Sequence, residues 1–342
     1  MFEPSFENYT PYEFAPLSLA NQDGQPLFVL IVKATFTIQP QQNTVLLSDE
    51  QIPVNLEGEY WGEPGKSSFR YEPEVAFFKP HTDIVLLGHA QSEKGKVKEL
   101  GVSLTVGENK KVARVTGDRQ WIKQYGFINM SDPLPFERIP LTYEYAFGGW
   151  DKSHPDENYH IFDTHNPVGR GFRESSKNYE EGIYLPNIEG LHNTIESFGQ
   201  VVTPAGFGFV CPEWQPRANY AGSFDEQWEK TRKPLLPLDF NPLFMNAAPH
   251  DLIAKNFING DESVEIINAS SQNRLCFNLP GILAPQCLVA LKNGQDEYPQ
   301  LVLDTLIIDT DNMHIQVLWR GHVLLQDGPL DVRTIVIRDN KQ

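Results

Sequence analysis

Alternation of apolar and polar residues at every second position is the feature that most constrains how this chain can fold. In residues 32–38, valine, alanine, phenylalanine and isoleucine alternate with lysine and threonine. Successive side chains of a β-strand point to opposite faces, so this period predicts a strand with one buried face. Residues 102–106 alternate in the same way, and a turn at 107–110 leads into a returning strand at 112–115. The pattern favours antiparallel sheet.

The C-terminal third continues this pattern. Residues 301–309 and 315–319 flank the turn-forming sequence Thr310-Asp311-Asn312, and together they predict a hairpin. Further strands are expected at 84–87, 275–279, 287–291 and 332–337.

The middle of the chain, from about 131 to 259, lacks this alternation. Proline, glycine, aromatic residues and Asn or Asp interleave there, as in residues 166–172. The residue before each proline is pushed out of the helical region of backbone space. We therefore expect ordered loops and short elements that lie on the β framework. We find no boundary that separates this region, so a single domain over residues 1–342 is predicted.

Few helices are expected. The best candidate covers roughly 224–232, because Ser223 and Glu226 have the spacing of a capping box and Pro234 follows the end. A second helical turn is expected after Asn193. The predicted fold class is mainly β, with an antiparallel framework, sandwich or barrel-like, under a loop-rich centre.

Charge excludes some partners. Acidic residues outnumber basic ones by 45 to 28, for a net charge of −17, so the surface repels nucleic acid and anionic lipid. A basic protein surface is a better partner, because opposite charge speeds encounter. The alternative is that the acidity only keeps a cytosolic protein in solution.

Several features predict a cytoplasmic protein that is not inserted in a membrane. The N-terminus has no basic segment followed by an apolar run, and the longest apolar run, 27–32, is too short for a span. Cys211, Cys276 and Cys287 form no CxxC pair, which favours reduced thiols and argues against a zinc site.

No motif points to catalysis. His154, His160, Asp163 and His165 have no spacing typical of a metal site, so a solvated loop is the better interpretation. Asp83, two residues after His81, is expected to make a structural hydrogen bond to nearby backbone. No GxSxG sequence and no phosphate-binding loop occurs. We therefore expect no enzyme activity, no cofactor and no metal.

Acids near tryptophans offer an alternative. Asp225, Glu226 and Glu229 lie near Trp214 and Trp228 in the sequence, a combination compatible with glycoside hydrolysis. Acids at the start of a helix are also expected from the helix dipole alone.

Arginines and tryptophans supply the candidate protein-interface residues. Such side chains either pin loops through forked hydrogen bonds or form interaction hot spots. The candidates are Trp121, Arg138, Trp150, Arg170, Trp214, Arg217 and Trp228.

A resemblance to a known family rests on many ordered pieces between about Gly58 and Gly281. The pieces are FKPHTDIV (78–85), VTGDRQW (115–121), PFERIPLTYE (135–144), AFGG (146–149), residues 166–172, LPNIE (185–189), PAGFG (204–208), WQPR (214–217) and residues 221–240. The sequence resembles a bacterial family encoded beside type VI secretion spike proteins, PAAR-type tip proteins and toxins. It departs from the family pattern at Ser223-Phe224 and at His250-Asp251-Leu252.

The resemblance implies an adaptor, or effector chaperone, that mounts an effector toxin on the spike and PAAR-type tip complex. It implies no catalytic residues. The alternatives from the residues themselves are a carbohydrate-active hydrolase and a sugar-binding module with aromatic platforms.

Overall fold

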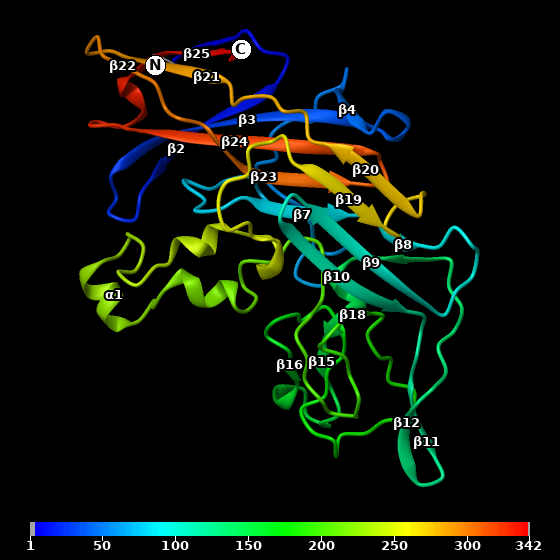
Figure 1. Cartoon of the computed structure of the whole chain (residues 1–342). Coiled ribbons are helices and arrows are strands. Elements are labelled where there is room, and N and C mark those ends of the chain that lie inside the picture. The colour runs from blue at the N-terminus through cyan, green and yellow to red at the C-terminus, as the bar shows by residue number, and fades with distance from the viewer. Residues whose placement is uncertain (1–3, 341–342) are drawn as a thin grey trace.

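The framework of the protein is a set of β-sheets built from both ends of the chain. The structure, a computed structural model, describes residues 4–340. The largest sheet has the strand order β2-β3-β24-β23-β7, with β4 paired to β3 (Figure 1). Its strands are β2 (Glu13–Ala20), β3 (Pro26–Gln39), β4 (Thr44–Leu47), β7 (Asp83–Leu87), β23 (Val302–Asp309) and β24 (His314–Leu324). N-terminal and C-terminal segments are therefore neighbours in one sheet.

A second sheet packs at one end of the first, where β4 meets β20. Its strand order is β18-β10-β9-β19-β20, and all its pairings are antiparallel. The strands are β9 (Glu99–Val106), β10 (Asn109–Thr116), β18 (Ile188–Gly190), β19 (Ser263–Ile267) and β20 (Arg274–Asn278).

A third, smaller sheet joins the two ends of the chain. Its order is β1-β25-β21-β22, and β1 runs parallel to β25. The strands are β1 (Ser5–Asn8), β21 (Gln286–Leu291), β22 (Asp296–Glu297) and β25 (Val332–Arg338). The sheets stay open at their edges, so the framework is layered and sandwich-like, and the prediction of a mainly β fold is confirmed.

Every strand predicted from alternation is present. Several shorter strands were not predicted, and the longest of these are β2 and β19. Strand β2 carries Pro16 and lies at the edge of its sheet, where a missing N–H is tolerated. Strand β19 is only five residues long and directly follows the irregular centre of the chain.

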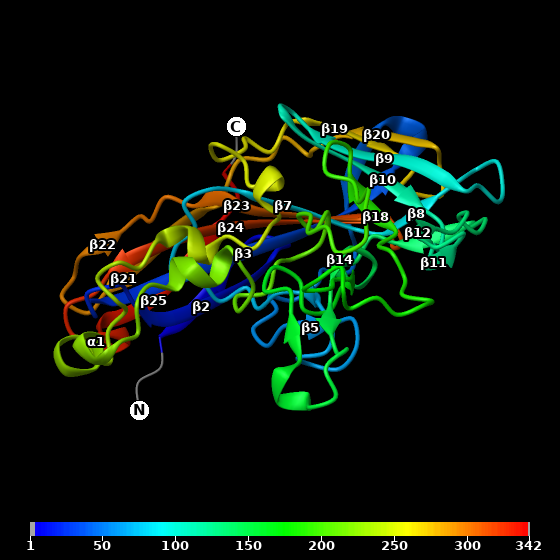
Figure 2. The same cartoon turned by 90° about the horizontal axis from the view of Figure 1, so that it is seen from below.

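The centre, residues 131–259, contains only short elements, as predicted. Its strands have two or three residues and mostly form isolated pairs with each other. Figure 2 shows this segment covering one side of the sheets. Across residues 4–340, the two-stranded pairs are β5 (Glu59–Tyr60) with β6 (Phe69–Tyr71), β8 (His89–Gln91) with β13 (Arg138–Pro140), β11 (Trp121–Gln124) with β12 (Phe127–Met130), β14 (Phe147–Gly148) with β17 (Arg170–Gly171), and β15 (Trp150–Asp151) with β16 (Ile161–Phe162).

The predicted helix forms, but its cap differs from the prediction. Helix α1 covers Glu226–Thr231, and the side chain of Asp225 accepts the N–H of Trp228. Ser223 instead donates its hydroxyl to Asp239, so the Ser223–Glu226 capping box was wrong. The helical turn expected after Asn193 was also wrong, because Asn193 forms a β-bridge with Gly190.

The hydrophobic core has two parts. The larger part lies between the main sheets and takes side chains from both ends of the chain. The smaller part comes from the segment between residues 121 and 202 and consists of Trp121, Phe147, Leu185, Ile195, Phe198 and Val202. Within residues 4–340, no helix has the length and apolar character needed to cross a membrane.

Candidate partner-binding cleft

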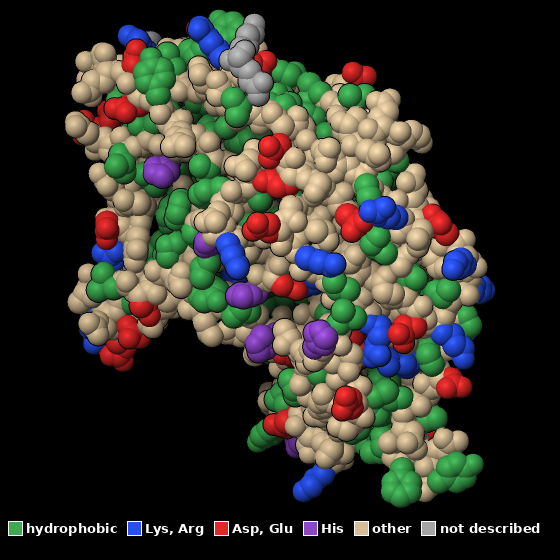
Figure 3. Space-filling view, viewed as in Figure 1, with side chains coloured by type: hydrophobic (Ala, Val, Ile, Leu, Met, Phe, Trp, Pro, Cys, Tyr) green, Lys and Arg blue, Asp and Glu red, His purple; other side chains and the backbone are tan. Residues whose placement is uncertain are grey.

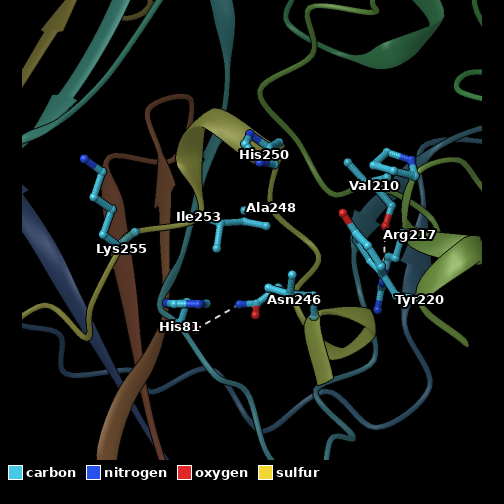
Figure 4. A pocket seen from close by; sticks show the side chains of 12 residues that line it. His81, Val210, Arg217, Tyr220, Asn246, Ala248, His250, Ile253 and Lys255 are labelled. Carbon is cyan, nitrogen blue, oxygen red and sulfur yellow. Dashed lines mark hydrogen bonds between the residues drawn. The ribbon is translucent and has the colours of Figure 1, made fainter. Parts of the chain in front are cut away.

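An apolar cleft opens where the central segment meets strand β7. It has a volume of about 350 Å³. His81, Asn246, Ala248, Ile253 and Lys255 line one side and the floor (Figure 4). Val210, Arg217 and Tyr220 face them from the other side. A concave site of this size with mainly apolar walls is typical of a binding pocket.

Asp83, the first residue of β7, holds the floor of the cleft. Its carboxylate is fully buried and accepts the side-chain amide of Asn246 at 2.9 Å. It also accepts the N–H groups of Ala247 and Ala248, and it pairs with Lys79 at 2.7 Å. A buried carboxylate with four donors is well satisfied and fixes the backbone that carries those donors. The predicted structural role of Asp83 is confirmed, but the backbone that it binds is distant in the sequence and not nearby as expected.

Thr82 extends this attachment along the chain. Its carbonyl accepts the N–H of Ala254 at 2.9 Å, and its hydroxyl accepts the N–H of Ile258 at 3.1 Å. The same hydroxyl donates to the carbonyl of Leu303 in β23. The wall of the cleft that contains η6 (His250–Leu252) is therefore tied to the main sheet at both ends.

Arg217 organises the opposite wall. It begins the short 3₁₀ helix η4 (Arg217–Ala221), is 7% exposed, and forms an ion pair with Glu72. Its guanidinium donates to the carbonyls of Phe244 at 2.8 Å and Val210 at 2.6 Å. One planar fork thus joins η4 to η5 (Pro242–Met245).

A second hollow of about 340 Å³ adjoins the cleft and shares Val210, Pro216 and His250 with it. Lys111 of β10 lies in this hollow and pairs with Asp251 of η6 at 2.7 Å. Burial lowers the pKa of Lys111, and the neighbouring Asp251 opposes that shift. The pair ties η6 to the five-stranded sheet as well.

The family of the chain follows from most of its length. A family model described as "uncharacterized protein conserved in bacteria" (DUF2169) matches residues 23–320. The chain belongs to this family. No curated protein and no solved structure matches it.

Three of the predicted interface residues are buried in this DUF2169 protein. Trp121 is 3% exposed and meets the ring of Phe198 edge-on, with the ring centres 5.5 Å apart. Trp214 is 2% exposed and packs in the same way on Tyr143. Arg217 is the third, and its guanidinium donates hydrogen bonds to carbonyls of the cleft wall. These contacts show that the two tryptophans pack inside the protein.

Two other predicted residues fasten loops. Arg170 donates to the carbonyl of Glu144 at 3.0 Å and to the side chain of Asn187 at 3.1 Å. Arg138 pairs with Asp311 at the turn after β23, and His89 contacts the other oxygen of that carboxylate at 2.7 Å. Both arginines thus follow the loop-pinning interpretation.

Trp150 and Trp228 remain at or near the surface. Trp150 is 44% exposed and lies against Phe162, with the ring centres 4.6 Å apart. Trp228 is half-buried and donates its indole N–H to the carbonyl of Leu235 at 2.8 Å. These two tryptophans retain surface that another protein can contact.

The groups considered for chemistry are engaged in local structure. His165 lies 3.2 Å from Asp163, and Glu229 pairs with Lys233 at 3.3 Å. Among the residues that the structure describes, no group of three or more His, Cys, Asp or Glu side chains is placed to hold a metal ion. All three cysteines are free, and burial raises the pKa of Cys211 and Cys287 to about 12.

Sequence reasoning identified only Arg217 and His81 among the residues of the cleft. The others come from segments that are distant along the chain and carry no motif for a site. The region around Asn246 and Pro249 was predicted only as part of the loop-rich centre of the chain, residues 131–259.

Proposed function

We propose that this DUF2169 protein is a cytoplasmic type VI secretion adaptor. It binds an effector toxin and loads it onto the spike and PAAR-type tip complex. The ordered motifs quoted above are the basis for naming this system. The structure supports the more general part of the proposal, that the protein binds a partner.

The preformed cleft is the observation that carries this proposal. Its two walls are held by buried hydrogen bonds to Asp83, Thr82 and Arg217, so little ordering is needed when a partner enters. A partner that binds such a preorganised site loses less conformational entropy on association. The walls of the cleft are mainly apolar, which suits the shielding of an apolar segment until loading.

Co-purification with the effector and the spike protein encoded beside the gene tests the proposal. We expect both to be retained by the wild-type chain. Ala248→Phe fills the cleft and should abolish retention, whereas Ala20→Phe at the exposed end of β2 should not. Failure of the wild-type chain to retain either soluble partner would contradict an adaptor role.

A carbohydrate-binding or hydrolytic role is the second candidate. It is favoured by a hollow of about 210 Å³ that Asp225, Trp228 and Asp239 line together. Hydrogen bonds from Ser223 lower the pKa of Asp239, however, whereas a general acid needs a raised pKa. Glycan-array binding that disappears in Trp228→Ala would support this candidate against the adaptor.

A further inference from the structure

The cleft and its neighbouring hollow form one groove that is longer than a single side chain. They have volumes of about 350 and 340 Å³ and meet at Val210, Pro216 and His250. Figure 3 shows histidine, lysine and arginine side chains gathered around apolar surface on this face of the molecule. The groove therefore has room for several consecutive residues of another chain.

The charges along the groove are opposite in sign to those of the whole chain. Acidic residues outnumber basic ones in the sequence, yet Asp251 is the only acid among the lining residues. The lining side chains that carry or can accept a positive charge are His81, Lys111, His165, Arg217, His250 and Lys255.

Three of these basic groups are balanced by carboxylates of the protein itself. Glu72 pairs with Arg217, Asp251 with Lys111, and Asp163 with His165. The other three lining groups have no such carboxylate partner. Within residues 4–340, Lys255, His81 and His250 form no ion pair. Lys255 and His250 are exposed, so the ammonium of Lys255 and the ring N–H of His250 are accessible to a ligand.

The walls between these groups are apolar. Val210, Leu243 and Ile253 contribute aliphatic surface, and Tyr220 contributes a half-buried ring. A ligand that satisfies both features combines apolar side chains, which leave water here, with carboxylates that reach Lys255 and His250.

We infer that the groove binds an extended partner segment in which apolar residues alternate with Asp or Glu. This inference rests on the proposed adaptor function and names the segment that the cleft takes from its cargo. It differs from the expectation for the whole surface, whose net charge of −17 favours a basic partner. The local charge determines which partner binds at the groove, because charges farther away than about 8–10 Å are largely screened at physiological salt.

Fluorescence anisotropy with two labelled ten-residue peptides tests the inference. One peptide alternates leucine with glutamate, and the other alternates leucine with lysine. The glutamate peptide is expected to bind, with affinity that falls as salt rises, and the lysine peptide is not. Equal binding of both peptides, or no binding of the glutamate peptide, overturns the inference.

Charge reversal in the protein locates the site. Lys255→Glu is expected to weaken binding of the glutamate peptide by about tenfold, because it replaces attraction by repulsion at the rim. Lys94→Glu changes the net charge equally at an exposed position outside the groove and should leave binding unchanged. Equal weakening by both variants would mean that only the total charge matters, which overturns the inference.

Co-purification separates this inference from the proposed function. If Lys255→Glu and Ala248→Phe, both shown to be folded by circular dichroism, still retain the effector, the groove is not the cargo site and the adaptor proposal stands. If the wild-type chain retains no effector, the adaptor proposal fails whatever the peptides do. Loss of self-association in Lys255→Glu, measured by sedimentation, would identify a second copy of this chain as the occupant and would also overturn the inference.

Discussion

Individual buried charges attach loops to the sheets of this protein. Lys33 of β3 is 1% exposed and pairs with Glu74 at 2.7 Å. The same ammonium donates to the carbonyl of Pro53, and Glu74 accepts the N–H of Asn55. Two charges thus connect the sheet to the segments around residues 53 and 74.

Removing one of these charges should cost much more than removing both. Lys33→Met leaves Glu74 buried without its cation, and we expect a loss of about 3–5 kcal/mol in the free energy of unfolding. The double variant Lys33→Met/Glu74→Gln should recover most of this loss, as measured by urea denaturation. A double variant as unstable as the sum of the two single variants would contradict the proposed coupling.

Asp151 provides a pH-dependent contribution at the residue scale. Burial alone would raise its pKa, but hydrogen bonds from Asn178, Ser153 and Glu174 outweigh this and lower the pKa from 3.8 to about 2. A carboxyl with a lowered folded-state pKa stabilises the fold above its unfolded-state value, and this stabilisation is lost as the pH falls through the folded-state value.

We therefore expect Asp151→Asn to be less stable than the wild type at pH 6. The difference should shrink as the pH falls from about 4 to about 2. Urea denaturation of both proteins across this range measures it. A difference that stays constant would show that the carboxylate charge is not what holds the loop.

The hairpin of β11 and β12 shows backbone strain at the scale of an element. Gln124 pairs with Phe127, so Tyr125 and Gly126 form a two-residue turn with φ values of 52° and 82°. Such turns favour Asn followed by Gly, because an ordinary side chain is strained at positive φ. Tyr125 is also 90% exposed, so its ring gains little from packing.

Tyr125→Asn is expected to stabilise this hairpin by about 1 kcal/mol, since asparagine adopts the left-handed conformation more readily. Hydrogen exchange of the hairpin amides should then slow. Tyr125→Ala keeps the strained backbone and serves as the control. Equal slowing in both variants would show that the ring, and not the backbone angle, causes the effect.

At the scale of the whole molecule, the start of strand β7 connects three distant parts of the chain. Asp83 binds the segment around Asn246, and Lys79 links Asp83 to Thr305 of β23 at 3.0 Å. The N-terminal part, the centre and the C-terminal part therefore meet at one buried carboxylate. The shape of the cleft depends on this junction.

Asp83→Ala should loosen the central segment more than the framework. It leaves Lys79 buried without its partner, and we expect a loss of about 3–5 kcal/mol. Limited proteolysis should cut between residues 241 and 258 faster than in the wild type. Asp23, whose side chain is 78% exposed in its pair with Arg232, offers a control, because Asp23→Ala should change neither stability nor cleavage appreciably.

The strand framework was predictable because its signal is local. Alternation places each buried side chain on one face, and residues 102–106 and 112–115 needed only their own turn to pair. Helix α1 was placed correctly for the same reason, but its cap was not. Ser223 and Asp225 are both good capping residues, and only the position of Asp239 decided between them.

What the sequence determined by itself is a mainly β chain with an irregular centre, since period and turn residues act over a few neighbours. Tertiary structure alone decided which aromatic side chains face solvent: Trp121 is covered by Phe198, while Trp150 stays exposed. It also decided that His81, Arg217 and Lys255 share one cleft. Burial and local charge depend on residues brought together from distant parts of the chain, and no short stretch of sequence encodes those contacts.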